Sequence, residues 1–290
     1  MSINLPLINV NGVLDAAISP LDRGFAYGDG VFETCRYQHG SIPLWSYHRE
    51  RLLHSAERLQ IPVDESLLMQ YLNSLLAQIA HSGIQGAVIK IILTRGVGGR
   101  GYRLPDFVKP TYCVGIFPCS QLQTDQYRDG VTVRVCNLRL AQSSALAGMK
   151  HLNRLEHILA RAEWQDEFAE GLLLDEQGRV VEATVSNLFA VKNNQLYTPD
   201  LSAAGVAGIM RRAIIEKLAP ELGIVCRIVD MELDFLKAAD EIFLCNSVYG
   251  IWPVNQLVDD RQTTISSRTN YNEFQVTRAL QKQLAYLLGE

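Results

Sequence analysis

One stretch decides how the chain is interpreted: GMKHLNRL, residues 148–155. It follows a β-rich segment and opens an apolar pattern through Leu155, Ile158 and Leu159, whose spacing predicts a helix. Lys150 therefore lies where a strand or loop passes into a helix, a position from which a side chain can face a cleft. Burial would lower the pKa of this lysine, because apolar surroundings penalise the ammonium ion, and the free amine could then form a Schiff base. Taken alone, the stretch fits a solvated surface lysine better.

The composition of the whole chain is that of an ordinary globular protein. Hydrophobic residues make up 48% and charged residues 20% of the 290 residues, and this length predicts two domains. The net charge of −4 provides no basic surface for nucleic acid or anionic lipid. No apolar run is long enough to cross a bilayer, and the N-terminal residues lack the features of a signal peptide. We therefore expect a cytoplasmic protein that acts on a small molecule, without nucleic-acid or membrane partners.

The cysteines give no sign of a disulfide framework or a metal site. No Cys-x-x-Cys pair is present, and no histidines accompany the cysteines at metal-ligand spacing. Most lie inside strand-like runs, so we expect buried free thiols in a reducing compartment. The six are Cys35, Cys113, Cys119, Cys136, Cys226 and Cys245.

An alternating stretch near the N-terminus carries the first candidate site residues. Residues 19–30 are rich in turn formers, and residues 31–37 alternate as a strand does. Phe32 and Thr34 are two positions apart, so they share one face of that strand and can both point into a site.

Two helices are expected next, over residues 46–60 and about 64–81, with Ser46 capping the first. Arg51 lies on the first helix within RLLHSA. A planar guanidinium suits a phosphate dianion, because two of its N–H groups can bind two oxygens. An arginine on a helix is otherwise usually solvated, and the segment taken alone fits that interpretation better.

Four glycines lie within six residues after the core strand predicted at residues 87–93. Such a run occurs in nucleotide-binding loops, but the Gly-Lys-Ser/Thr ending of a P-loop is missing and no helical pattern follows. We predict instead a flexible loop that presents Arg100 and Tyr102. Arg95, directly after the strand, is expected to be a structural ion-pair partner.

Glu182 stands in a strand otherwise composed of valine, alanine, leucine and phenylalanine. A carboxylate is costly to bury in such a strand unless it has a partner. A protonated pyridine nitrogen would be such a partner, and the carboxylate would keep that proton in place, so that the ring withdraws electrons more strongly. The alternative, an exposed strand position, agrees less well with the apolar neighbours.

A glycine-rich turn at residues 204–212 leads into a helix. The backbone N–H groups of Ile209 and Met210 would form an anion site at the start of that helix. An ordinary glycine-led helix start explains the local sequence equally well. Residues 242–248 predict a core strand that ends in polar residues, among them Ser247.

Together these segments resemble the fold type IV pyridoxal-phosphate enzymes, a family that includes aminodeoxychorismate lyases and the branched-chain and D-amino-acid aminotransferases. The lysine stretch carries the likeness with DRGFAYGDGVFET at residues 22–34 and VEATVSNLF at residues 181–189. The likeness runs in order from about residue 8 to about residue 254. It implies pyridoxal 5'-phosphate as cofactor, no metal, and a homodimer.

The resemblance also implies a fold and a set of roles. The fold is α+β, with a smaller N-terminal α/β domain (residues 1–120), a linker (121–127) and a larger C-terminal β-rich domain with helices (128–290), the cofactor lying between the domains. The cofactor-binding residues implied are Arg51, Lys150, Glu182, Val206, Ile209, Met210 and Ser247. The substrate-binding residues implied are Phe32, Arg100 and Tyr102, and the catalytic residues are Lys150 and Thr34.

The activity implied depends on the branch of the family. The lysine stretch and RGVGGRGY at residues 95–102 most resemble the lyases, which convert 4-amino-4-deoxychorismate to 4-aminobenzoate and pyruvate for folate synthesis. The alternative is an aminotransferase of the same fold that acts on D-amino or branched-chain amino acids. Phe32 stands where the D-amino-acid enzymes carry a tyrosine and Tyr102 where they carry a histidine, and both departures count against that subclass. A third alternative is a binding protein that keeps the fold without the chemistry.

Overall fold

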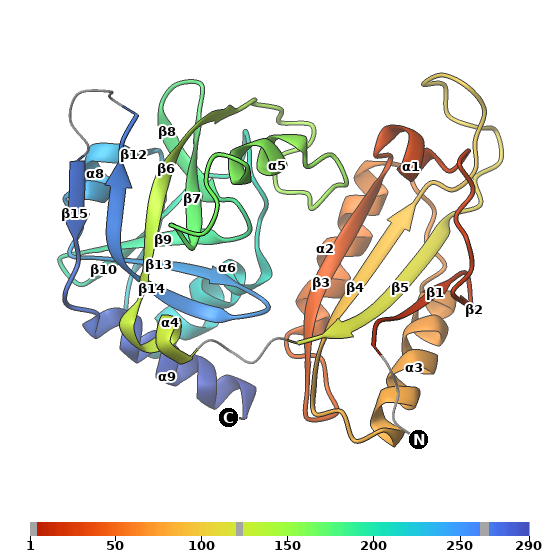
Figure 1. Ribbon diagram of the computed structural model, residues 1–290, viewed down its shortest axis with the longest axis horizontal. Helices are drawn as coiled ribbons and strands as arrows, with labels where there is room; N and C mark the ends of the chain where they lie inside the picture. Colours follow the sequence, from red (N-terminus) through yellow and green to blue (C-terminus); the bar gives the residue numbers. More distant parts are fainter. Residues whose placement is uncertain (1–4, 120–123, 262–266, 290) are drawn as a thin grey trace. The chain divides into compact units, whose positions relative to one another are not determined.

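The computed structural model describes residues 5–119, 124–261 and 267–289, and the chain forms two compact units (Figure 1). The first comprises Met1–Ser120 together with Met149–Asn153. The second comprises Gln121–Gly148 and Arg154–Glu290. The lysine stretch is thus counted with the N-terminal unit, although the residues on both sides of it belong to the other one.

The first unit is built on a five-stranded antiparallel sheet with the strand order β2-β1-β5-β4-β3. One face of its long strands is buried with leucines of two helices, because alternate positions of each strand are apolar. The opposite face carries the half-buried side chains of Phe32 and Thr34. The strands are β1 (Leu7–Val10), β2 (Val13–Leu14), β3 (Gly30–Gln38), β4 (Gly86–Thr94) and β5 (Thr111–Pro118), and the helices are α1 (Arg23–Tyr27), α2 (Trp45–Arg58) and α3 (Glu65–His81).

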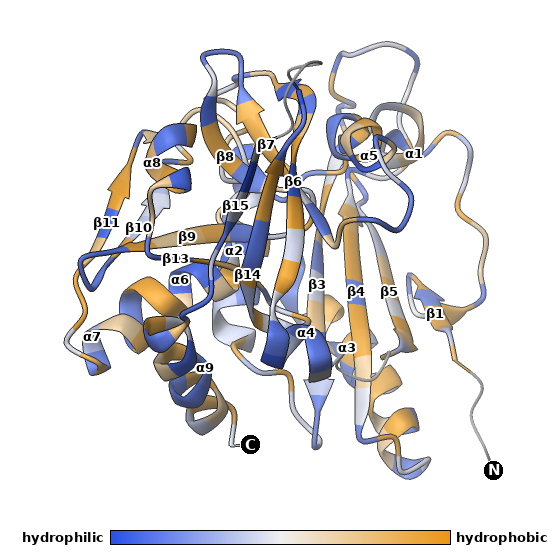
Figure 2. Cartoon of the chain, turned by 60° about the vertical axis from the view of Figure 1, so that its left-hand side comes forward, coloured by the Kyte–Doolittle hydropathy of each residue, from blue (hydrophilic) through white to orange (hydrophobic). Residues whose placement is uncertain are grey.

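The second unit is built on a ten-stranded mixed sheet with the order β11-β10-β9-β13-β14-β6-β7-β8-β12, in which β15 pairs with β14. Strands β9 and β13 are mostly hydrophobic (Figure 2) and buried over nearly their whole length, as expected for strands covered on both faces. The strands are β6 (Val131–Leu140), β7 (Glu170–Asp175), β8 (Arg179–Ala183), β9 (Asn187–Lys192), β10 (Gln195–Pro199), β11 (Cys226–Val229), β12 (Met231–Glu232), β13 (Glu241–Asn246), β14 (Gly250–Asp259) and β15 (Ser267–Asn270). The helices are α4 (Thr124–Asp129), α5 (Leu155–Arg161), α6 (Ile209–Ala213), which continues into the π-helical turn Ile214–Leu218, α7 (Ala219–Glu221), α8 (Leu233–Lys237) and α9 (Gln275–Leu288).

Element boundaries differ from the expected ones at two places. Helix α2 begins at Trp45 with Leu44 as its N-cap, so the predicted Ser46 cap is wrong; the left-handed backbone at Leu44 turns the chain into the helix without a side-chain cap. Residues 124–127, assigned from the sequence to a linker, form the start of α4, whereas the linker residues 121–123 lie outside the described part of the chain. Helix α3 is confirmed at Glu65–His81.

The apolar stripe of α5 points outward. Leu155 is 73% exposed, Ile158 61% and Leu159 60%, whereas Ala160 is buried. The spacing of these apolar residues correctly predicted a helix, but their side chains are exposed to solvent and not buried.

In the part of the chain that the structure describes, none of the helices combines the length and the apolar character needed to cross a membrane.

Candidate active site

Main-chain hydrogen bonds hold Lys150 against the edge strand of the first unit. The amide of Phe32 donates to the carbonyl of Lys150 (2.9 Å), and the amide of Leu152 donates to that of Gly30 (3.0 Å). The lysine stretch therefore supplies hydrogen-bond partners for backbone groups at the edge of β3, which would otherwise be unpaired. The Lys150 Nζ atom lies 4.5 Å from the centroid of the Phe32 ring, within the range of a cation–π contact. Backbone and side chain together fix the position of the amine.

A second lysine lies beside the same aromatic ring. Lys90 pairs in register with Thr34 across β3 and β4, and its Nζ atom is 5.4 Å from the Phe32 ring centroid. Phe32, Thr34 and Lys90 thus occupy one sheet face, as the alternation of β3 predicted for the first two. The sequence analysis missed Lys90, although a lysine inside the apolar run at residues 87–93 was a usable signal.

Arg51 is held by a buried carboxylate on the other face of β3. Its Nε atom donates to Glu33 Oε1 (2.7 Å) and its Nη2 atom to Oε2 (2.5 Å), while His48 Nδ1 lies 2.7 Å from Oε2. Burial opposes the ionisation of Glu33, but Arg51 and His48 outweigh it and hold the pKa of this carboxyl below its usual value. These two hydrogen bonds to Glu33 use two of the five N–H groups of the guanidinium. Phosphate binding by Arg51 stays a prediction.

The same carboxylate belongs to a group of three potential metal ligands, Glu33, Cys35 and His48, whose ligand atoms lie within 4.8 Å of one another. Burial, followed by the charge of Glu33, raises the pKa of the Cys35 thiol well above its usual value. A cation here would also face the guanidinium of Arg51. We therefore interpret the group as part of the ion-pair network.

The glycine-rich loop is anchored more firmly than its composition predicted. Arg23 donates to the carbonyl of Gly101 (3.0 Å), the amide of Gly101 donates to the Tyr27 hydroxyl (3.1 Å), and the rings of Tyr27 and Tyr102 meet edge to face. Arg100 and Tyr102 themselves are exposed. Side chains of α1 thus bind the middle of the loop, and its flexibility stays a prediction.

Arg95 has the structural role expected of it. Its guanidinium forms two hydrogen bonds with Asp29 (2.7 and 3.0 Å) and donates to the carbonyls of Leu59 and Gln60 (2.7 and 2.9 Å). It thereby ties the start of the glycine-rich loop to the end of α2.

Glu182 lies on β8 in the second unit and is buried, as its apolar neighbours predicted. Its Oε1 atom is 2.9 Å from His157 Nε2, and its Oε2 atom accepts from the amide of Val206 at 2.8 Å. The positive charges of Arg154 and Arg211 also act on this carboxylate. His157 was not identified from the sequence, because nothing in the spacing of residues 157 and 182 indicates that they meet.

The turn that follows β10 is shaped by two glycines. Gly205 has φ +83°, a conformation that L-residues avoid. A Cβ atom on Gly208 would come within 1.9 Å of Asn187 Oδ1, and Asn187 Nδ2 donates to the carbonyl of Val206 (2.9 Å). Asn187 therefore clamps a turn that has room only for glycine at position 208.

This turn fits a phosphate group. Gly208 is the N-cap of α6 and has no side chain to cap it, so the N–H groups of Ile209 and Met210 in the first helical turn lack intrahelical acceptors. Ser247 lies in the turn after β13, which Asn246 holds by accepting from the amides of Val248 and Tyr249. These are the donor types that suit a phosphate dianion.

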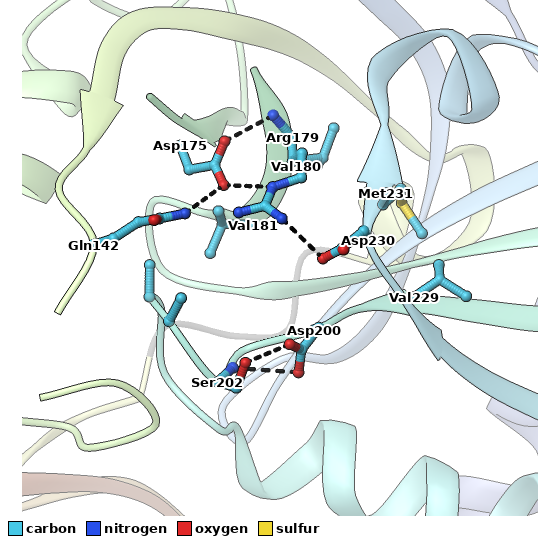
Figure 3. A pocket seen from close by; sticks show the side chains of 12 residues that line it. Gln142, Asp175, Arg179, Val180, Val181, Asp200, Ser202, Val229, Asp230 and Met231 are labelled. Atoms are coloured by element: carbon cyan, nitrogen blue, oxygen red, sulfur yellow. Dashed lines mark hydrogen bonds and ion pairs between the residues drawn. The ribbon is translucent and has the colours of Figure 1, made fainter. Parts of the chain in front are cut away.

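A cavity of about 270 Å³ in the second unit contains none of the predicted site residues (Figure 3). Its polar side chains bind one another: Arg179 pairs with Asp175 (2.8 Å) and Asp230 (3.2 Å), and Gln142 donates to Asp175 (2.9 Å). Asp200 accepts from the hydroxyl of Ser202, and the other lining side chains are those of valine, alanine and methionine. We assign this cavity no catalytic role.

Comparisons with known proteins agree with this geometry. The chain matches the family described as Amino-transferase class IV over residues 30–257. It is 38% identical over 248 residues to the aminodeoxychorismate lyase of Vibrio harveyi, which covers 85% of this chain and 89% of the relative. It is 30% identical over 255 residues to the branched-chain-amino-acid aminotransferase of Escherichia coli K12, covering 84% and 81%.

Among solved structures, the 4-amino-4-deoxychorismate lyase of Pseudomonas aeruginosa superposes with a TM-score of 0.87 at 42% identity, covering 97% of this chain and 98% of that one. The chain therefore belongs to the class IV aminotransferase family. It has the two-unit α+β fold of fold type IV, and it is a pyridoxal-phosphate enzyme.

Proposed function

We propose that this chain converts 4-amino-4-deoxychorismate to 4-aminobenzoate and pyruvate. The observation that carries the proposal is the second lysine: Lys90 lies on the same sheet face as Lys150, with Phe32 in contact with both ammonium groups. The lyase substrate has two carboxylates, and we assign them to Lys90 and to Arg100 in the glycine-rich loop. A branched-chain amino acid would instead bring an apolar side chain, for which a second lysine is a poor neighbour. The lyases among the relatives support the same choice.

The side chains of the first unit suit the proton transfers of this reaction. When bound, pyridoxal phosphate supplies an aldehyde that joins an amine and a ring that draws electrons from the carbon next to the nitrogen. Lys150 would hold the cofactor and, with its amine free, would remove the proton from the amine-bearing ring carbon of the substrate. The C–O bond to the enolpyruvyl group then breaks, and Lys150 or Thr34 protonates the departing oxygen. The product ring becomes aromatic, which drives the reaction forward.

The second unit holds the cofactor in this proposal. Glu182 keeps a proton on the ring nitrogen, and Val206 packs against the ring face. Ile209, Met210 and Ser247 donate to the phosphate, with Arg51 of the first unit as a further ligand.

We also propose that two copies assemble into a homodimer in the cytoplasm. Large apolar side chains are exposed on α5, as described above, and on the first unit, where Phe25 is 75%, Tyr102 85% and Phe107 93% exposed. Exposed large apolar side chains are common at association surfaces. All six cysteines are free thiols, in agreement with a reducing compartment.

The direct test is incubation with 4-amino-4-deoxychorismate while 4-aminobenzoate and pyruvate are followed together. We expect the two products in equal amounts. Lys150→Ala should abolish both, together with the borohydride-reducible attachment of the cofactor, and Lys150→Arg should do the same because a guanidinium is not nucleophilic. Formation of an amino acid from a 2-oxo acid, without 4-aminobenzoate, would establish the aminotransferase alternative instead.

Lys90→Met tests the observation that carries the proposal. A charge-assisted contact to a carboxylate contributes about 1.5–3 kcal/mol, so the variant should lose roughly 10- to 100-fold in kcat/KM. The cofactor absorbance should stay unchanged, since Lys90 is assigned to the substrate alone. Unchanged kcat/KM in Lys90→Met would remove the argument for a two-carboxylate substrate.

A further inference from the structure

The contact between His157 and Glu182 is not explained by the roles assigned so far. His157 lies on α5, and its side chain is 14% exposed, while that of Glu182 is 4% exposed. Both oxygens of the carboxylate are engaged, one by His157 Nε2 at 2.9 Å and the other by the amide of Val206 at 2.8 Å. The carboxylate therefore has a fixed plane and direction, and the imidazole is one of the two groups that fix it.

Helix α5 is itself held firmly, so it can place this imidazole accurately. Glu156 accepts from the amide of Ala141 at 2.8 Å, and Arg161 donates to the carbonyl of Trp164 at 2.8 Å. Ala160 packs with Trp164 in an apolar cluster of the second unit. His157 is thus anchored from both sides along a seven-residue helix.

The surroundings of the ring decide which nitrogen carries the proton. An ionised carboxylate only accepts hydrogen bonds, so His157 Nε2 must be the donor toward Glu182. The Nδ1 atom of His157 is buried and has no hydrogen-bond partner among the described residues. A proton on Nδ1 would be a buried donor without an acceptor, which is more costly than an unpaired lone pair. The geometry therefore selects the neutral ring with its proton on Nε2.

We infer that His157 is a positioning residue that, as a neutral donor, aims the Glu182 carboxylate at the cofactor's ring nitrogen. A cationic imidazole at this place would compete with the pyridinium for the carboxylate, whereas a neutral imidazole fixes the direction without adding a charge. The inference rests on the cofactor role that the proposed function gives Glu182 and is independent of the substrate.

The test compares His157→Gln with His157→Leu in the enzyme loaded with cofactor that is isotopically labelled at the ring nitrogen. Glutamine can keep an N–H donor toward Glu182, and leucine cannot. We expect the NMR shift of the ring nitrogen in His157→Gln to match the wild type. In His157→Leu it should move toward the value of the deprotonated ring, and kcat should fall about 10-fold with little change in KM. His54→Leu on α2, where the side chain is 67% exposed, is the matched control and should behave as the wild type.

A merely structural role predicts a different result. It would lower the melting temperature of the apoprotein in both His157 variants and leave the ring nitrogen unmoved, and that outcome would overturn the inference. A fully protonated His157 ring in the NMR spectrum of the wild-type enzyme would also overturn it, and this measurement needs no folded leucine variant. If the wild type released no 4-aminobenzoate, the proposed substrate would fail, but the shift of the ring nitrogen would still decide the role of His157.

Discussion

Glu33 and Glu182 are both buried carboxylates on strands, and both meet a histidine, yet their other hydrogen-bond donors differ. Glu33 also binds the guanidinium of Arg51 through both of its oxygens. Glu182 instead accepts from the backbone amide of Val206, and the charges of Arg154 and Arg211 act on it. The first carboxylate is bound by a bidentate guanidinium, and the second by an imidazole and a backbone amide.

This difference separates a structural carboxylate from one prepared for a ligand. A buried charge is tolerated when it is paired with an opposite charge. A carboxylate that is already paired with an arginine of the same protein attracts a cationic ligand less strongly. A buried carboxylate whose hydrogen bonds come from an amide and an imidazole remains attractive to a further cation, and a protonated pyridine nitrogen is such a cation. The contrast predicts that Glu33 matters to folding and Glu182 to the cofactor.

Removing the partner of Glu33 should have the largest effect. Arg51→Met leaves Glu33 buried without its main cation, and breaking a buried ion pair in this way typically costs about 3–5 kcal/mol. We expect the free energy of unfolding of the apoprotein, measured with urea, to fall by about this amount. Arg49→Met on the same helix is the matched control, because Arg49 pairs with Glu65 at the surface and should change stability little.

A second substitution sharpens this result. Glu33→Gln added to Arg51→Met removes the uncompensated charge and should recover part of the lost stability. Equal losses in Arg51→Met and Arg49→Met would contradict the view that the chain neutralises Glu33 from within.

Glu182→Gln should give the opposite pattern. Glutamine can keep the contact with Val206 by accepting from its amide, but donating to His157 would move the ring proton to the buried Nδ1 atom, so the apoprotein should lose some stability, though less than Arg51→Met. Catalysis should fall roughly 100-fold or more, because a charge-assisted hydrogen bond of about 1.5–3 kcal/mol at the electron sink is weakened. Steady-state kinetics beside apoprotein melting separate the two effects. Near-normal turnover in Glu182→Gln would show that this carboxylate does not serve the cofactor.

The sequence could predict the burial of Glu182 but not the ion pair of Glu33. A carboxylate within an apolar run at residues 179–189 indicates a buried charge in need of a partner, and the periods at residues 31–37 and 64–81 predicted β3 and α3. The partners of both carboxylates come from distant parts of the chain, and spacing along a sequence carries no information about such contacts. Arg51 was accordingly considered only as a phosphate ligand, although Glu33 is its immediate neighbour in the fold.

Two further features could not be predicted, for separate reasons. The stripe on α5 follows the period of a buried helix face, but period alone does not say whether the covering surface belongs to the same chain. The lysine stretch was expected to start a helix, and its pairing with β3 depends on a strand more than a hundred residues earlier. Lys90, in contrast, was visible as a charge within an apolar strand and could have been identified by the reasoning applied to Glu182.

The smallest predicted effect concerns pH and again involves Glu33. Arg51 and His48 hold its pKa in the folded protein below the usual value of 4.5 against the opposing effect of burial, so folding favours the ionised form. The stabilisation is fully present above the pKa of the unfolded chain, about 4.3, and is lost as the pH falls through the lower value of the folded state. Below about pH 4.3 the wild type should therefore lose stability faster than Glu33→Gln, by at most about 1.4 kcal/mol per pH unit. Glu176→Gln, at an exposed turn, is the control and should follow the wild type. Urea unfolding between about pH 6 and pH 3 makes the measurement, and parallel curves for wild type and Glu33→Gln would mean that burial cancels the effect of Arg51 and His48 on the pKa of this carboxyl.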